Sequence, residues 1–173
     1  MKTETNKTAG AEQESMDVRV ALHPFLAGMN SAQLETLTHC AMAAQFRTGQ
    51  VILREGEIAN RFYLIETGRV ALEFSQGAGA PLVVEMIGAG DLLGWSWMFP
   101  PYAWHFTARA VEPTEALFFY GTILREHCEK DPALGFELLK RIASVMLRRL
   151  QAARKRMAST HSPGWVHQFE RSC

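Results

Sequence analysis

The chain has 173 residues, 47% of them hydrophobic, and its 18 basic and 18 acidic residues give a formal net charge of zero. This length suits one domain with a sizeable core, and the balanced charge argues against a surface devoted to nucleic acid, which needs a basic excess. No apolar run is long enough to span a bilayer and no secretory leader is visible, so we expect a cytoplasmic protein.

Polar residues dominate positions 1–16, which we expect to be a disordered tail. Asn30 or Ser31 can cap a short helix that carries Leu34 and Leu37 at helical spacing. Three cysteines without a C-x-x-C spacing indicate unpaired thiols in a reducing compartment; they are Cys40, Cys128 and Cys173.

Glycines then divide residues 49–94 into short apolar or alternating runs, which is typical of antiparallel strands joined by tight turns. Val70, Leu72 and Phe74 alternate with less apolar neighbours, the period of a strand with one buried face. The predicted strands are approximately 44–47, 51–54, 62–67, 69–74, 82–87, 92–94, 106–112 and 115–120.

Two helices are predicted after the strands, a short one over 122–129 and a long one from Pro132 to Ser159. Apolar residues on the long helix repeat at steps of four and three, which predicts a heptad seam for a second copy of the chain: Leu139, Ala143, Met146, Leu150, Ala153 and Met157. A neighbouring stripe of Leu138, Ile142 and Val145 is predicted to lie on the barrel. One broad core face is the alternative. We expect a solvated basic face at positions 140, 141, 148, 149 and 154–156.

Many positions at fixed offsets resemble the cyclic-nucleotide-binding domain of the Crp/Fnr family: Phe46, Gly49, Ile52, Glu55-Gly56-Glu57, Ala59, Phe62-Tyr63-Leu64-Ile65, Gly68, Val70 and Gly90-Asp91-Leu92-Leu93-Gly94. The resemblance covers roughly residues 20 to 158. It implies a mainly β fold with flanking helices, in which a jelly-roll β-barrel is followed by a long C-terminal helix. We therefore expect a tail over 1–16, this domain over 17–158 and a second tail over 159–173.

The C-terminal tail of 15 residues is shorter than the roughly 50 residues that an independent domain needs. We therefore expect no helix-turn-helix domain of the kind that follows this helix in Crp-like regulators. Trp165, Val166 and Phe169 in the tail either fold back, dock on a partner or belong to a frayed end. The histidines lack metal-ligand spacing, so no metal site is expected.

The resemblance also implies a phosphate-binding cassette after Gly90-Asp91-Leu92-Leu93-Gly94, with a glutamate for the ribose and an arginine for the cyclic phosphate. In this sequence Trp95 stands at the glutamate position, and the arginine position falls on Trp104, or on His105 if one residue is gapped. Loss of a charge-assisted phosphate contact costs about 1.5–3 kcal/mol. Tight conventional binding of cyclic AMP is therefore not expected.

Two interpretations of the tryptophan-rich cassette remain open. The indoles either stack on a flat anionic ligand, such as a cyclic nucleotide or NAD(P)H, or fill the cup of the barrel themselves. The candidate ligand-binding residues are Gly94, Trp95, Ser96, Trp97, Trp104, His105 and Arg109. Arg109 has a structural alternative, an ion pair with Glu85 or Glu112.

No catalytic motif is present, so we expect a non-enzymatic sensor or regulatory module. Its output would pass through the long helix to a partner, with a homodimer through that helix and no membrane contact. The alternative is a non-catalytic accessory subunit of a multi-subunit complex. The cassette is similar to stand-alone cyclic-nucleotide-like proteins of bacteria, some of which resemble the small extra subunit of NAD-linked soluble hydrogenases.

Overall fold

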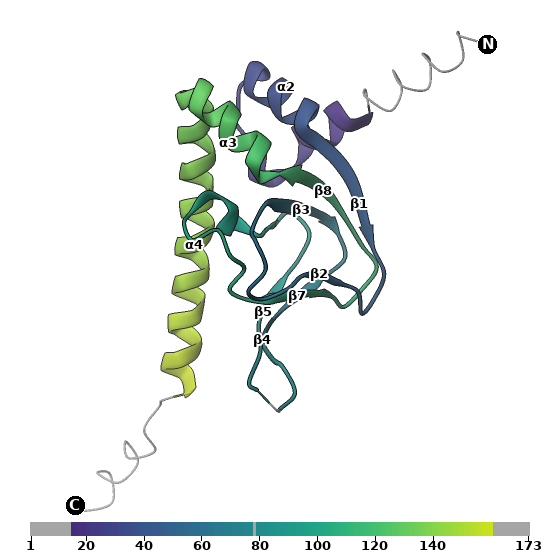
Figure 1. Cartoon of the computed structure of the whole chain (residues 1–173), viewed down its shortest axis with the longest axis vertical. Coiled ribbons are helices and arrows are strands. Elements are labelled where there is room, and N and C mark those ends of the chain that lie inside the picture. The colour runs from purple at the N-terminus through teal and green to yellow at the C-terminus, as the bar shows by residue number, and fades with distance from the viewer. Residues whose placement is uncertain (1–14, 78, 161–173) are drawn as a thin grey trace, which may run out of the picture.

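Two four-stranded antiparallel sheets face each other to form a barrel in a computed structural model, which describes residues 15–77 and 79–160 (Figure 1). The first sheet has the order β1 (Ala41–Phe46), β8 (Thr114–Tyr120), β3 (Arg61–Thr67) and β6 (Leu92–Leu93). The second has the order β2 (Val51–Leu53), β7 (Thr107–Ala110), β4 (Val70–Phe74) and β5 (Leu82–Ile87). The predicted mainly β fold with a long C-terminal helix is confirmed.

The first sheet separates two hydrophobic clusters, because successive residues of a strand point to opposite faces. Phe62 and Leu64 of β3 face outward into a cluster shared with the helices, which we call the outer cluster. Tyr63 and Ile65 of the same strand face the second sheet and belong to the inner cluster, which fills the barrel. The outer cluster attaches the helices, and the inner cluster surrounds the space in which a ligand site is expected.

Besides a helix over residues 15–22, these elements cover the outer face of the first sheet or connect the strands: η1 (Pro24–Leu26), α2 (Ser31–Cys40), η2 (Trp95–Met98), α3 (Gly121–Lys130) and α4 (Pro132–Thr160). The predicted cap of α2 is confirmed, because Asn30 Oδ1 accepts a hydrogen bond from the Gln33 N–H at 2.9 Å. The reciprocal bond from the Asn30 N–H to Gln33 Oε1 completes a capping box.

Residues 15–22 are helical, so positions 15 and 16 continue the ordered domain rather than the tail to which the sequence pattern assigns them. Met16 packs on the outer cluster, which explains why the helix extends back to it. β1 begins at Ala41, earlier than predicted, because its pairing with β8 extends to Phe119. Of the predicted tails 1–16 and 159–173, residues 1–14 and 161–173, with Trp165, Val166 and Phe169, lie outside the described residues, and α4 continues to Thr160.

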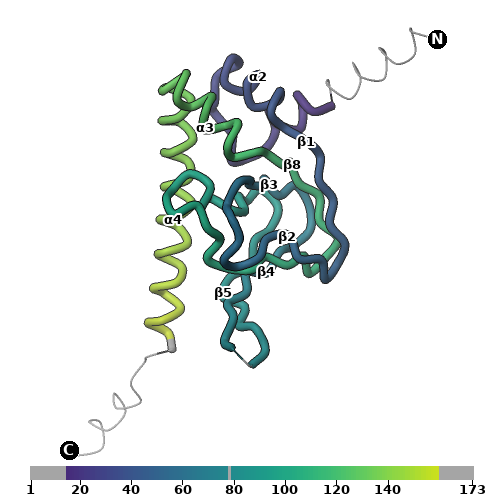
Figure 2. Tube along the Cα trace, in the orientation of Figure 1, coloured from purple at the N-terminus to yellow at the C-terminus, as the bar shows by residue number. Residues whose placement is uncertain are grey.

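Helix α4 runs along one side of the barrel for nearly its full height (Figures 1 and 2). Leu138, Ile142 and Val145 are at most 3% exposed and belong to the outer cluster, so the predicted core-facing stripe is confirmed. Five of the six residues of the predicted heptad seam are exposed in the single chain. We call these six residues the outer seam: Leu139, Ala143, Met146, Leu150, Ala153 and Met157.

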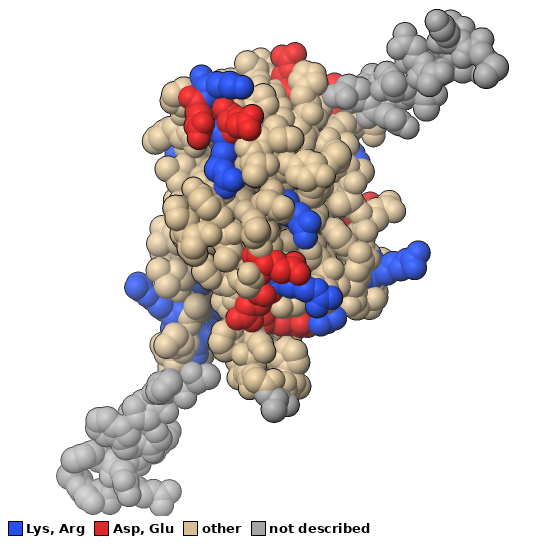
Figure 3. Space-filling view, in the orientation of Figure 1, with Lys and Arg blue, Asp and Glu red and all other residues tan. Residues whose placement is uncertain are grey.

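Acidic and basic side chains are interspersed on the face shown in Figure 3, as the zero net charge suggests. Seven ion pairs join the described residues, among them the contact of Arg19 with Glu66 at 2.5 Å. Within the described residues, no helix combines the length and the apolar character that crossing a bilayer requires.

His23 is a buried polar anchor at the start of η1. Its Nδ1 accepts a hydrogen bond from the Phe25 N–H at 3.2 Å, so the proton lies on Nε2, which donates to the Ile65 carbonyl at 3.0 Å. Burial lowers the pKa of His23, against the opposing effects of the Ile65 carbonyl and Glu66. The neutral ring therefore joins η1 to β3.

We predict that the free energy of unfolding falls as the pH drops below about 6.5, the ordinary pKa of histidine. The pKa of His23 is lower in the folded state, so the unfolded chain binds this proton first and gains stability over that interval. The slope reaches at most about 1.4 kcal/mol per pH unit for one proton. Urea unfolding between pH 5 and 8 measures it, and His23→Asn should flatten the curve. An unchanged slope in His23→Asn contradicts the prediction.

Candidate functional site

A small cavity of about 70 Å³ opens at the mouth of the barrel, beside the turn from β6 into η2. Five of the seven candidate ligand-binding residues line it: Gly94, Trp95, Ser96, Trp104 and His105. Leu53, Leu72 and Leu93 form its apolar floor, and Arg149 of α4 completes the wall. The structure therefore brings most of the predicted cassette together and adds a cation from the C-terminal helix.

Trp104 fills the mouth of the barrel. Its side chain is 4% exposed and belongs to the inner cluster. Its ring lies so close to Gly94 that a Cβ added there would be 3.1 Å from Cη2 and Cζ3. The remaining cavity is far below the roughly 300–1,000 Å³ of typical small-molecule sites. In this conformation the cup holds an indole where a nucleotide would need space.

Trp97 lies on the other side of the first sheet. It is fully buried in the outer cluster and stacks on Phe62, with ring centroids 5.1 Å apart and an interplanar angle of 14°. A Cβ added to Gly121 would be 2.7 Å from the Trp97 Cβ, so α3 begins directly against this ring. Trp97 is thus placed as core material and does not line the cavity.

Arg109 also points away from the cavity. Its neighbours Ala108 and Ala110 on β7 are fully buried in the inner cluster, so Arg109 lies on the opposite face of the sheet. Its Nε donates to Glu73 Oε1 at 2.9 Å, and its Nη1 donates to the Gly49 carbonyl at 3.0 Å. The predicted alternative is an ion pair of Arg109 with Glu85 or Glu112. Arg109 does form an ion pair, but its partner is Glu73.

Arg149 is the functional candidate that the sequence pattern missed. The prediction of a solvated face at this position is wrong, because the side chain is only 12% exposed. Nη2 donates to the Leu92 carbonyl at 2.7 Å, Nε lies 3.1 Å from Glu85 Oε1, and the guanidinium lies 4.7 Å from the centre of the Trp95 ring. Arg149 follows Val145 by one helical turn and so continues the buried stripe, which is the signal that could have identified it.

Burial of the ion pair between Arg149 and Glu85 carries an electrostatic free-energy penalty. Burial raises the pKa of Glu85 despite the opposing charges of Arg149 and Arg156. Burial also lowers the pKa of Arg149, although Glu85 and Asp91 act in the other direction. For both partners the loss of hydration outweighs the mutual attraction, as happens for ion pairs removed from water.

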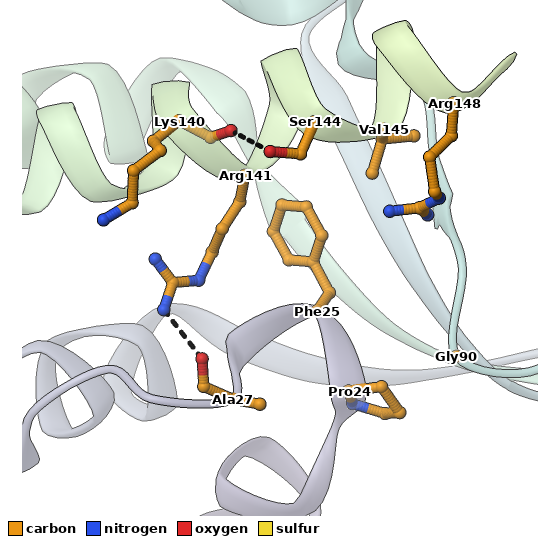
Figure 4. Close-up of a pocket in the computed structure, with 9 residues that line it drawn as sticks. All are labelled: Pro24, Phe25, Ala27, Gly90, Lys140, Arg141, Ser144, Val145 and Arg148. Carbon is orange, nitrogen blue, oxygen red and sulfur yellow. Dashed lines mark hydrogen bonds between the residues drawn. The ribbon is translucent and has the colours of Figure 1, made fainter. Parts of the chain in front are cut away.

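A second, open hollow of about 390 Å³ lies between α4 and η1 (Figure 4). Its basic side chains have partners, because Glu137 pairs with both Lys140 and Arg141, and Asp91 lies 3.7 Å from Arg148. Figure 4 also shows Arg141 turned toward the backbone beside η1. This hollow is therefore less suited to an anionic ligand than the cavity at the mouth of the barrel.

No group of three or more potential metal-binding side chains occurs within 15–77 and 79–160. Cys40 and Cys128 are free thiols in that part of the chain, whereas Cys173 lies outside it. Burial raises the pKa of Cys128 to about 11, with smaller contributions from Asp131 and Glu129. That thiol is therefore protonated and unreactive at neutral pH.

The chain belongs to the cyclic nucleotide-binding domain family, whose family model matches residues 43–131. A crystal structure of a putative cyclic nucleotide-binding protein from Geobacter metallireducens GS-15 has a TM-score of 0.70 and 30% identity. That match covers 78% of this chain and 97% of the Geobacter protein.

Two curated relatives extend the comparison. A CRP-like cAMP-activated global transcriptional regulator of Mycobacterium tuberculosis is 25% identical over 154 residues, which are 87% of this chain and 67% of the regulator. Lysophospholipase nte1 of Neurospora crassa is 29% identical over 102 residues, or 59% of this chain. The chain spans only 7% of that lysophospholipase.

We predict that Trp104→Ala lowers the free energy of unfolding by about 3–5 kcal/mol, because a buried indole is removed and a cavity remains. Urea denaturation measures the loss. Trp95→Ala is the matched control, because its ring is only half-buried and should cost less. A Trp104→Ala loss within about 0.5 kcal/mol, the range of surface substitutions, would show that the indole does not fill the barrel.

We predict that Gly94→Ala destabilises the chain by about 1–2 kcal/mol, because residue 94 has φ of +88° and left-handed backbone is unfavourable for alanine. Contact of the new methyl group with Trp104 adds to the loss. Gly56→Ala shares the positive φ but meets open space, so the difference between the two variants measures the new methyl group's contacts with Trp104 and, at 3.3 Å, with Leu53 Cδ1. Equal losses in both variants would contradict close packing on Trp104.

Proposed function

We propose that this chain is a non-enzymatic regulatory module in which a change at the mouth of the barrel is transmitted through α4 to a partner. The observation that carries the proposal is that Arg149 belongs to α4 and also forms part of the cavity wall. Displacement of the groups around its guanidinium therefore acts directly on the helix. The effector is a nucleotide-like anion, and membership of a cyclic nucleotide-binding family supports this class of ligand.

The proposed partner is a second copy of the chain, paired along the outer seam. Leu139, Met146 and Leu150 are 38–48% exposed in the single chain and follow a heptad spacing. A helix with one apolar stripe on its own domain and another in water is suited to pairing with a similar helix. Pairing would place the ligand-dependent part of α4 in the dimer interface.

We predict that Leu150→Glu weakens dimerisation at least about tenfold, because it would bury a carboxylate in an apolar seam. Sedimentation equilibrium measures the dissociation constant. Gln151→Glu introduces the same charge at the next, exposed position outside the outer seam, and should leave dimerisation unchanged. A wild-type chain that is monomeric at high concentration would remove the homodimer from the proposal.

The sensor role is tested by calorimetry with cyclic AMP, cyclic GMP, NADH and NADPH, combined with sedimentation of each mixture. We expect weak binding of at least one compound and a change in the dimer constant, because a ligand shifts an equilibrium only by its differential affinity for the two states. Binding heat without any change in dimerisation would contradict transmission through α4. Folded protein that binds none of the four compounds would remove the sensor role.

The alternative function is that of an accessory subunit without a ligand of its own, for example in an NAD-linked soluble hydrogenase. The buried indole of Trp104 in the barrel mouth favours it. So does the exposed apolar surface of β4 and β5, formed by Phe74, Leu82, Val83 and Met86. Purification from the native host distinguishes the two functions, since a stoichiometric enzyme complex supports the accessory role and a homodimer alone opposes it.

A further inference from the structure

The guanidinium of Arg149 is held in a fixed orientation at the cavity wall. The Leu92 carbonyl accepts a hydrogen bond from Nη2, and the ring of Trp95 lies against the guanidinium at 4.7 Å. A guanidinium has five N–H donors, and both donors on Nη1 lack a protein acceptor among the described residues. Arg149 is thus a pre-oriented cation with unused donors beside a cavity.

Glu85 is the anion that pairs with the Arg149 guanidinium, and this pairing is loose. It lies opposite Leu72 in the pairing of β4 with β5, and directly opposed residues share a face of the sheet, so both point toward the cup. Its carboxylate lies 3.1 Å from Arg149 Nε without a well-aligned hydrogen bond. Arg109, in contrast, donates a hydrogen bond of 2.9 Å to Glu73.

The cavity beside Arg149 matches an oxyanion group in size. A volume of about 70 Å³ exceeds the 10–15 Å³ that one water requires and is too small for a nucleoside. His105 and Phe106 at its rim are exposed, so the remainder of a larger ligand can extend outward past them. The unused donors of the guanidinium therefore suit one oxyanion group of a ligand.

We propose that Arg149 is the anion-binding residue of this site and that a phosphate or carboxylate group binds there by displacing the carboxylate of Glu85. The proposal rests on the sensor function above and supplies its regulation. Arg149 of α4 supplies the cation that the cassette lacks at Trp104. The carboxylate of Glu85 pairs with this cation and therefore competes with the ligand. Binding exchanges one ion contact for another, with no covalent step. Each exchange moves a residue of the C-terminal helix relative to β5.

Calorimetry on the full chain tests this site with three probes: inorganic phosphate, AMP and acetate. Phosphate and acetate distinguish the two oxyanion chemistries, and AMP shows whether a nucleoside is accommodated at the rim. Glu85→Gln should tighten binding of at least one probe about tenfold or more, because the internal competitor loses its charge. Arg149→Gln should weaken it by at least the same factor. Arg148→Gln, at an exposed neighbour on α4, is the matched control and should bind like wild type.

Arg149→Gln leaves Glu85 half-buried without its cation and could unfold the chain. The double variant Glu85→Gln/Arg149→Gln removes both charges, and its fold is checked by urea denaturation. It should bind the probes no better than Arg149→Gln. Binding by the folded double variant within about twofold of Glu85→Gln overturns the proposal, and so does the absence of binding in both wild type and Glu85→Gln. Binding through Arg149 with unchanged dimerisation keeps this site and overturns only the transmission through α4.

Discussion

The burial of the Arg149 guanidinium between the barrel and α4 is the interaction on which this account depends. The helix is attached through its first half by apolar residues such as Leu138, Ile142 and Val145, which pack in the outer cluster. Beyond Val145 the helix contacts the barrel through a largely buried cation, Arg149, which meets β5 at Glu85 and β6 at Leu92. A charge in this position loses hydration that its ion pair does not fully restore. An apolar residue would attach the helix more strongly but could not respond to an anion.

The indole of Trp104 has the complementary effect on the cup. The resemblance places the phosphate arginine of the cassette at this position, or at His105 if one residue is gapped, and the indole of Trp104 fills the space itself. The cavity that remains is too small for a nucleotide. In the proposed site the charge is supplied from outside the cassette, by Arg149, which lines the cavity. A site assembled in this way favours a small anionic group and connects it to the helix more directly than a contact within one loop would.

The strands and the long helix could be predicted because their signals are local. The position of β4 and the stripe of Leu138, Ile142 and Val145 on α4 follow from periodicity. The expected single buried face of β4 is wrong, because Ala71 and Glu73 are buried as well and Phe74 is exposed. The sides to which Trp97 and Trp104 point could not be predicted, since the intervening turn decides which core cluster receives each indole. The sequence pattern assigns Arg149 to the solvated face because the residue is charged, although its spacing continues the buried stripe.

The most direct test of the account is the hydrogen exchange of backbone amides in the Glu85→Gln/Arg149→Gln double variant compared with wild type. If the ion pair attaches α4 to the mouth of the barrel, amides of the helix beyond Val145 lose protection while those of β3 and β8 keep it. Unchanged protection along α4 in a folded double variant would contradict the coupling of the cup to the helix.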